Sequence, residues 1–271
     1  MVDIELLKKI CLTPGAPGFE QPIRALLMQE MEGYADDVQI DPMGNLIVFI
    51  KGISSSKLML TAHMDEISFI VQHIDDDGFI RFLPLGGFDA KTLTAQRVKI
   101  HGKKEVIGVM GSKPIHLMNP DERNKAAQIK DYFIDTGLPK AELEKYISIG
   151  NPITRERELI QMGKCINSKS LDNRISVYVL LEIIKAFGKA KPELDLYAVF
   201  TVQEEVGLRG AKSAAHRIAP DYAINIDTTI AFDVTDASTA KLVLLALAET
   251  CLLYTSPSPR DRTRSRMPSS A

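Results

Sequence analysis

The chain has 271 residues with 33 basic and 35 acidic side chains, which gives a formal net charge of −2. This charge argues against a nucleic acid or an anionic membrane as the partner. Three cysteines are too few for a disulfide framework, and we find no early basic-then-apolar signal and no apolar stretch of membrane-spanning length. We therefore expect a cytoplasmic protein, long enough for one large domain or two modest ones.

The final segment, 251–271, is expected to be non-native. Cys251–Asp261 can be back-translated into DNA that resembles the end of a transposon-based sequencing adapter, and Ser265–Ala271 resembles the outer end of the same adapter. A disordered Ser/Pro/Arg tail is the alternative, but two matches in one reading frame favour the adapter. We expect the natural sequence to be truncated at or before Thr250. Without this tail, 29 basic and 34 acidic residues remain, and the net charge becomes −5.

Residues 1–66 alternate between helical and strand patterns. Apolar spacing predicts helices around Leu6–Ile10 and Ile23–Met31, separated by the Pro- and Gly-rich segment Pro14–Gly18. Apolar runs then predict three strands: Val38–Ile40, Leu46–Ile50 and Leu58–Ala62. The last strand delivers His63 at its carboxyl end. We assign 1–66 to the first part of an α/β domain.

Residues 67–163 have a different character, because short strands separated by turns dominate. The expected strands are Ser68–Gln72, Phe79–Phe82, Arg97–Ile100 and Val106–Met110. A charged helical piece, Pro139–Lys145, lies among them. This pattern indicates a small β-barrel-like domain inserted into the α/β frame.

The α/β pattern resumes over 164–250, the second part of the first domain. Arg174–Phe187 is apolar on nearly every side, as in a helix packed against a sheet. A strand over Leu194–Val202 and a helix from Ala211 follow, and a strand over Tyr222–Ile226 ends at Asp227. The predicted fold class is therefore α/β, with a mixed sheet and an inserted barrel-like domain.

Four short acidic or histidine-containing clusters lie at the ends of these predicted elements. They are Thr61–Glu66, Ser170–Asn173, Gln203–Gly207 and Asn225–Asp227. Ligands of open α/β sheets gather beyond the carboxyl ends of the strands, so we expect the clusters to converge there. Carboxylates with one imidazole suit zinc, cobalt or manganese, and the pattern predicts a metal-dependent hydrolase.

Each cluster alone also has an ordinary structural interpretation. A histidine after a strand is more often structural than a ligand, and Asp172 could be the N-cap of the following helix. Glu204 and Glu205 could lie in a solvated loop, and Asp227 could cap a strand end. Together these interpretations would require four separate polar element ends at one sheet edge, which favours a shared site.

The chain resembles the M42 family of dinuclear metallo-aminopeptidases, which includes glutamyl and tetrahedral aminopeptidases. The match covers nearly all of 1–236. Besides the four clusters, it is carried by Pro14–Glu20, Gly86–Asp89, Gln96–Ile100, Gly111–His116, Phe133–Gly137, Lys169–Arg174 and Glu204–Ala211. The resemblance implies that the two α/β parts form a catalytic domain and that the inserted domain serves oligomerisation, with dimers that build a dodecamer.

The resemblance also implies two divalent metal ions per subunit, zinc or cobalt or else manganese, that share a bridging water. This water would attack the first peptide bond of substrates with a free N-terminus. The implied metal ligands are His63, Asp172, Glu205 and Asp227, with Asp172 bridging the ions; Glu204 is the implied general base and Asp65 the carboxylate that orients His63.

The chain departs from the family pattern at one ligand. The family uses a second, downstream histidine, whereas no histidine follows Asp227 here, so we expect impaired activity. Two alternatives stay open: a non-catalytic fragment that self-associates through its inserted domain, and a related dinuclear deacylase or carboxypeptidase. A glycosidase is the least favoured interpretation, because the adjacent carboxylates Glu204 and Glu205 seldom flank a sugar bond.

Overall fold

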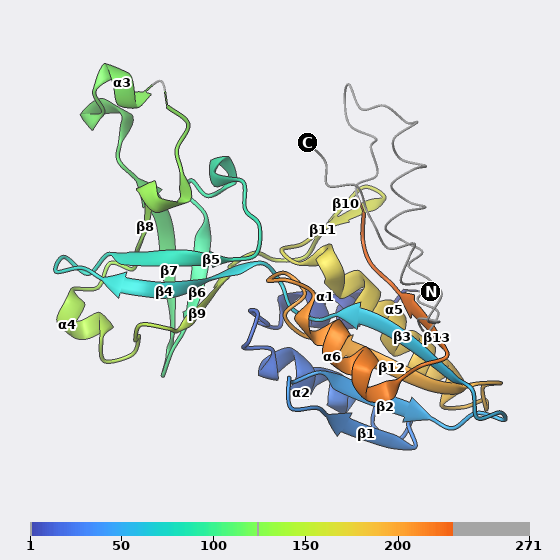
Figure 1. Ribbon diagram of the computed structural model, residues 1–271. Helices are drawn as coiled ribbons and strands as arrows, with labels where there is room; N and C mark the ends of the chain where they lie inside the picture. Colours follow the sequence, from blue (N-terminus) through green and yellow to red (C-terminus); the bar gives the residue numbers. More distant parts are fainter. Residues whose placement is uncertain (1, 124, 230–271) are drawn as a thin grey trace, which may run out of the picture.

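A mixed five-stranded sheet forms the larger part of the molecule (Figure 1). The computed structural model describes residues 2–123 and 125–229, and the expected adapter-derived tail at 251–271 lies outside them. The sheet order is β1-β2-β12-β3-β13. The strands are β1 (Asp37–Ile40), β2 (Leu46–Ile50), β3 (Lys57–His63), β12 (Asp195–Thr201) and β13 (Tyr222–Asn225).

Parallel pairing aligns the strand ends that carry the clusters. Strands β12 and β13 both run parallel to β3, and Thr201 of β12 stands opposite His63 of β3. Strands β1 and β2 are joined to the rest of the sheet by antiparallel pairing. The chain therefore leaves β3, β12 and β13 at one common edge of the sheet.

Helices cover both faces of this sheet, because its central strands β2, β12 and β3 are apolar on both sides. Apolar residues of α1 (Ile4–Leu12), α2 (Gln21–Glu30) and α5 (Leu171–Phe187) pack on one face and form the main core. Helix α6 (Arg209–Ile218) covers the other face through a smaller cluster. Among the described residues, no helix has the length and apolar character needed to cross a membrane.

The second part of the molecule is a closed six-stranded barrel with its own apolar core (Figure 1). Its strand order is β4-β5-β8-β7-β6-β9, with two short helices, α3 (Pro120–Arg123) and α4 (Lys140–Leu143). The strands are β4 (Ser68–Ile74), β5 (Ile80–Leu85), β6 (Arg97–His101), β7 (Glu105–Ser112), β8 (Tyr132–Asp135) and β9 (Pro152–Arg155). The predicted fold class, a mixed α/β sheet with an inserted barrel, is confirmed.

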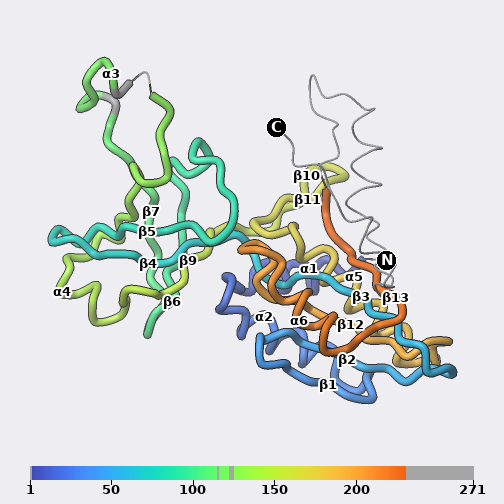
Figure 2. The backbone as a smooth tube through the Cα atoms, viewed as in Figure 1, coloured from blue at the N-terminus to red at the C-terminus, as the bar shows by residue number. Residues whose placement is uncertain are grey.

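The chain crosses between the two parts twice, as the continuous tube in Figure 2 shows. The outgoing crossing lies between the end of β3 and the start of β4. The returning crossing follows β9 and contains a hairpin of β10 (Ile160–Met162) and β11 (Cys165–Asn167) before α5 begins. Both crossings therefore adjoin segments that carry one of the clusters.

Candidate metal centre

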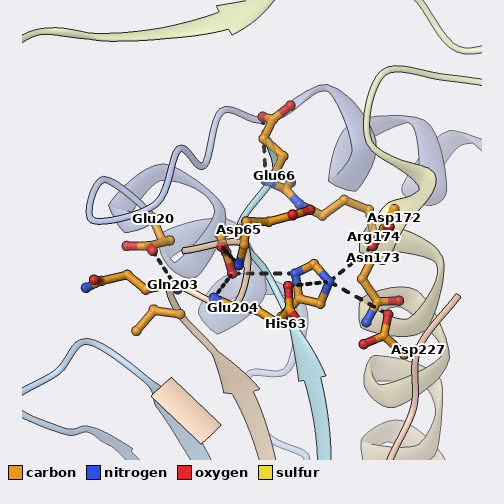
Figure 3. A network of polar contacts seen from close by, with 12 residues as sticks. Glu20, His63, Asp65, Glu66, Asp172, Asn173, Arg174, Gln203, Glu204 and Asp227 are labelled. Atoms are coloured by element: carbon orange, nitrogen blue, oxygen red, sulfur yellow. Dashed lines mark hydrogen bonds and ion pairs between the residues drawn. The ribbon is translucent and has the colours of Figure 1, made fainter. Parts of the chain in front are cut away.

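His63 stands at the centre of the four clusters, as the last residue of β3 (Figure 3). Its side chain is almost fully buried. The ring atom Nε2 lies 3.1 Å from Oδ1 of Asp172, 3.7 Å from Oδ1 of Asp227 and 3.9 Å from Oε2 of Glu204. Three segments that are separate in the sequence thus bring carboxylates to the Nε2 edge of one imidazole.

Asp65 connects His63 to the pair of glutamates. Its fully buried carboxylate accepts hydrogen bonds from the backbone N–H groups of Glu204, at 3.0 Å, and of Glu205, at 3.1 Å. The same carboxylate lies 3.5 Å from Nδ1 of His63, on the side of the ring opposite the other acidic groups. Asp65 therefore fixes the turn after β12 relative to the end of β3.

Asp172 lies where the first turn of α5 is distorted. Both Asp172 and Asn173 have non-helical backbone angles, and Ser170 occupies the N-cap position. The backbone therefore departs from the helical path at the residue whose carboxylate contacts His63. The side-chain amide of Asn173 donates a 3.0 Å hydrogen bond to the carbonyl of Ile226, which ties the start of α5 to the residue before Asp227.

The geometry of the turn after β12 depends on strained backbone positions. Gln203 and Leu208 have positive φ angles of 53° and 56°, a region that side chains with a Cβ seldom occupy. Gln203 is held by its N–H, which donates to the buried carboxylate of Glu20 at 3.1 Å. The sequence patterns gave Glu20 no role, since it only ended a Pro- and Gly-rich loop; its long-range bond is visible only in the fold.

Burial, together with neighbouring negative charges, raises the pKa values of acidic site residues. Burial raises the pKa of Glu205 to about 7, with the charge of Asp172 acting in the same direction. Burial also raises the pKa values of Glu204 and Asp227, whereas the neighbouring His63 opposes both shifts. These carboxylates are thus crowded to the point at which some resist ionisation without a compensating cation.

The pKa of His63 moves in the direction that compensates the carboxylates. Burial lowers it, but the side chains of Asp172 and Asp65 outweigh this effect and raise it to about 10. A protonated imidazole here supplies one positive charge to a strongly acidic cluster. A divalent cation would bind the neutral ring instead and would compensate the charges of more than one carboxylate at once.

Two groups of side chains have ligand atoms close enough to share a metal ion. Within each group, all ligand atoms lie within 4.8 Å of one another. The groups are His63, Asp172 and Asp227, and His63, Glu204 and Glu205. All the sequence-predicted ligands therefore meet at this edge of the sheet, and His63 belongs to both groups.

A cavity of about 600 Å³ opens beside these groups, between α6 and the sheet. His63, Glu204 and Asp227 line one part of it. Lys212 and His216 of α6 line another part, together with small and apolar residues. The site thus faces a space large enough for an organic ligand.

Comparisons with known proteins place this chain in a family. The model of the M42 glutamyl aminopeptidase family matches residues 44–250. A lysyl aminopeptidase of Pyrococcus furiosus is 37% identical over 240 residues, which cover 85% of this chain and 68% of the relative. The chain thus spans about two thirds of the length of such relatives.

Solved structures show the same similarity in three dimensions. An aminopeptidase of the archaeon Desulfurococcus kamchatkensis superposes with a TM-score of 0.82 at 39% identity, covering 88% of this chain and 66% of that one. The TET1 peptidase of Pyrococcus horikoshii, which can assemble into a tetrahedron or a large octahedral shell, superposes with a TM-score of 0.77 at 32% identity, covering 88% and 73%. With a family match over most of its length and these relatives, the chain belongs to the M42 family of aminopeptidases.

Proposed function

We propose that this chain provides a metal-dependent aminopeptidase site that releases the N-terminal residue from peptides. The observation that carries the proposal is the convergence of one imidazole and four carboxylates from four separate segments beside a cavity. The names of the relatives, lysyl aminopeptidase among them, support the substrate class. A free amino terminus is therefore the feature that we expect a substrate to need.

The side chains present fit divalent metal ions. Oxygen and imidazole donors are the ligands of zinc, cobalt and manganese, and these donors lie within 4.8 Å of one another in each of the two groups. We assign His63, Asp172, Glu205 and Asp227 as the residues that would hold two such ions. When bound, the ions would polarise the peptide carbonyl and make a water molecule more acidic.

Glu204 is assigned as the general base. Its half-buried carboxylate lies beside the cavity, 3.9 Å from Nε2 of His63, while its backbone is held by Asp65. The raised pKa of Glu204, caused mainly by burial, brings it closer to neutral pH, where a base both takes up and releases a proton efficiently. It would accept a proton from the attacking water and donate it to the leaving amine.

Asp65 is assigned as a positioning residue for this chemistry. Its carboxylate faces Nδ1 of His63 and leaves Nε2 directed at the other carboxylates. A neutral ring that carries its proton on Nδ1, beside Asp65, offers a metal ion the lone pair of Nε2. Carboxylate partners of histidine ligands commonly select this tautomer. The same carboxylate accepts hydrogen bonds from the backbone of Glu204 and Glu205. Asp65 would therefore position both the general base and one metal ligand.

The ligand set of one ion is expected to be weaker than that of the other. The second histidine implied by the family pattern has no counterpart after Asp227 in this sequence. We therefore propose impaired activity for this chain, with one ion held less tightly. Assembly through the barrel into a homo-oligomer is proposed by analogy with the tetrahedral shell of the TET1 peptidase.

A substrate panel with metal analysis tests the function. Aminoacyl anilides with free amino termini should be hydrolysed after loading with zinc, cobalt or manganese, and their acetylated forms should not. Cleavage of blocked substrates would instead favour a deacylase or carboxypeptidase. Absence of both turnover and bound metal would favour the alternative of a non-catalytic fragment that self-associates.

A further inference from the structure

Three charged residues without a role in the proposed chemistry are buried together where the barrel joins the sheet. Glu66 and Arg174 have no exposed surface, and Lys169 is 5% exposed. The ammonium of Lys169 donates to both carboxylate oxygens of Glu66, at 2.6 Å for Oε2. Nη2 of Arg174 lies 3.8 Å from the same carboxylate. This junction ion pair, Lys169 with Glu66, is shielded from solvent.

The junction ion pair joins the two crossings of the chain. Glu66 lies in the outgoing crossing between β3 and β4, and Lys169 lies in the returning crossing between β11 and α5. Each crossing is also fixed to the α1 region: the N–H of Glu66 donates to the carbonyl of Gly15 at 2.9 Å, and the hydroxyl of Ser170 donates to the carbonyl of Cys11 at 2.7 Å. The pair is therefore part of a rigid junction.

Both partners adjoin the candidate metal centre in the sequence. Glu66 directly follows Asp65, whose carboxylate holds the backbone of Glu204 and Glu205. Lys169 precedes Asp172 by three residues. A displacement of either crossing would therefore move one side of the site relative to the other.

The free-energy cost of burying charges indicates that this ion pair fixes the positions of the two crossings more than it stabilises the fold. Removing two charges from water costs free energy that their attraction seldom exceeds, so an apolar pair would stabilise the fold as well. The contact of one ammonium with both carboxylate oxygens does, however, fix the separation of the two backbone segments. Arg174 needs the same carboxylate, since its Nη2 has no hydrogen-bond partner among the described residues.

We infer that Lys169 and Glu66 are positioning residues that set the separation between the His63–Asp65 segment and Asp172. The inference rests on the proposed function, because this separation matters for holding metal ions between the two segments. The variant pair Lys169→Met with Glu66→Gln tests it, since it removes one positive and one negative charge together. Gln keeps the shape of Glu66 and an acceptor for Arg174.

Two measurements on the full chain distinguish positioning from simple stabilisation. Zinc, cobalt and manganese affinities should fall by about 10–100-fold in the double variant, as for other groups that orient metal ligands. In the metal-free protein, the backbone amides of Glu204 and Glu205 should exchange hydrogen faster, because Asp65 is released. Lys169→Met alone, which leaves Glu66 beside the guanidinium of Arg174, should show the same changes and serves if the double variant does not fold.

The control is a second ion pair at the other end of the sheet. Nζ of Lys51 lies 3.0 Å from the carboxylate of Asp195 at the start of β12, so Lys51→Met with Asp195→Asn removes the same charges far from the site. Metal affinity and amide exchange equal to those of the parent in the junction variants would overturn the inference. A parent chain that binds no metal would contradict the proposed function. The hydrogen-exchange rates of the Glu204 and Glu205 amides would then decide by themselves whether the junction ion pair positions the site.

Discussion

His63 and Asp172 are 109 positions apart in the sequence, yet Nε2 of one lies 3.1 Å from Oδ1 of the other. Between them the chain builds the whole barrel and returns. The contact therefore forms only if the chain returns correctly from the barrel to the sheet. Neither residue can serve as a metal ligand in this site unless both are in place. Four predictions follow from this dependence and from the packing around it.

Replacing either contact residue should abolish high-affinity metal binding. His63→Ala removes the side chain common to both groups of ligand atoms, and Asp172→Asn removes a charge from one of them. We expect metal affinity to fall by at least ~100-fold, more than for groups that only orient ligands. Titration with zinc or cobalt measures this, and the exposed His116→Ala is the control. Unchanged affinity in both variants would contradict the ligand assignment.

Glu204→Gln should separate metal binding from catalysis. The amide keeps the shape of the side chain but cannot accept and return a proton, so turnover should fall by about 100-fold or more while metal content stays at the parent value. The exposed Glu32→Gln is a matched control. Turnover comparable with that of the parent would remove Glu204 as the base.

Gly210→Ala should destabilise the turn that presents the two glutamates. A Cβ at Gly210 would lie 2.4 Å from both the side-chain oxygen of Asn45 and the carbonyl oxygen of Val202. Relief of this overlap would move α6 away from β12, at a cost of about 1–3 kcal/mol in the free energy of unfolding. Urea denaturation measures the loss. Gly87→Ala has open space around its Cβ and should match the parent.

Asp195 should make the fold sensitive to acid. Its carboxylate accepts from the N–H of Gly52 at 2.8 Å and from Nζ of Lys51 at 3.0 Å, and these bonds lower the pKa of Asp195. The stabilisation is thus fully present above the unfolded pKa, about 3.9, and is lost as the pH falls through the lower folded value. Asp195→Asn should flatten the loss of stability below about pH 4, measured by urea midpoints. An acid response identical to that of the parent would refute this role.

The sequence predicted the elements whose apolar patterns are long. The helix after Asp172 and the strands that end at His63 and before Glu204 follow from burial against a sheet, which leaves a strong periodic signal. Strands β8 and β9 were not predicted, because each pairs only with strands that are distant in the sequence and therefore depends on barrel closure. Similarly, no local pattern predicts that Lys169 would meet Glu66 or that Glu20 would hold Gln203, since these contacts exist only after distant segments have packed.

The barrel is connected to the sheet by two crossings of the chain, and these crossings are bound to each other by Glu66 and Lys169. Because the two crossings are joined at that point, the packing of β3 against α5 is fixed on the sheet side of the junction. Domain insertions are tolerated when their ends lie close together. We therefore expect a change in the length of a barrel loop distant from this ion pair, such as the one between β7 and β8, to leave the residues at the sheet edge in place.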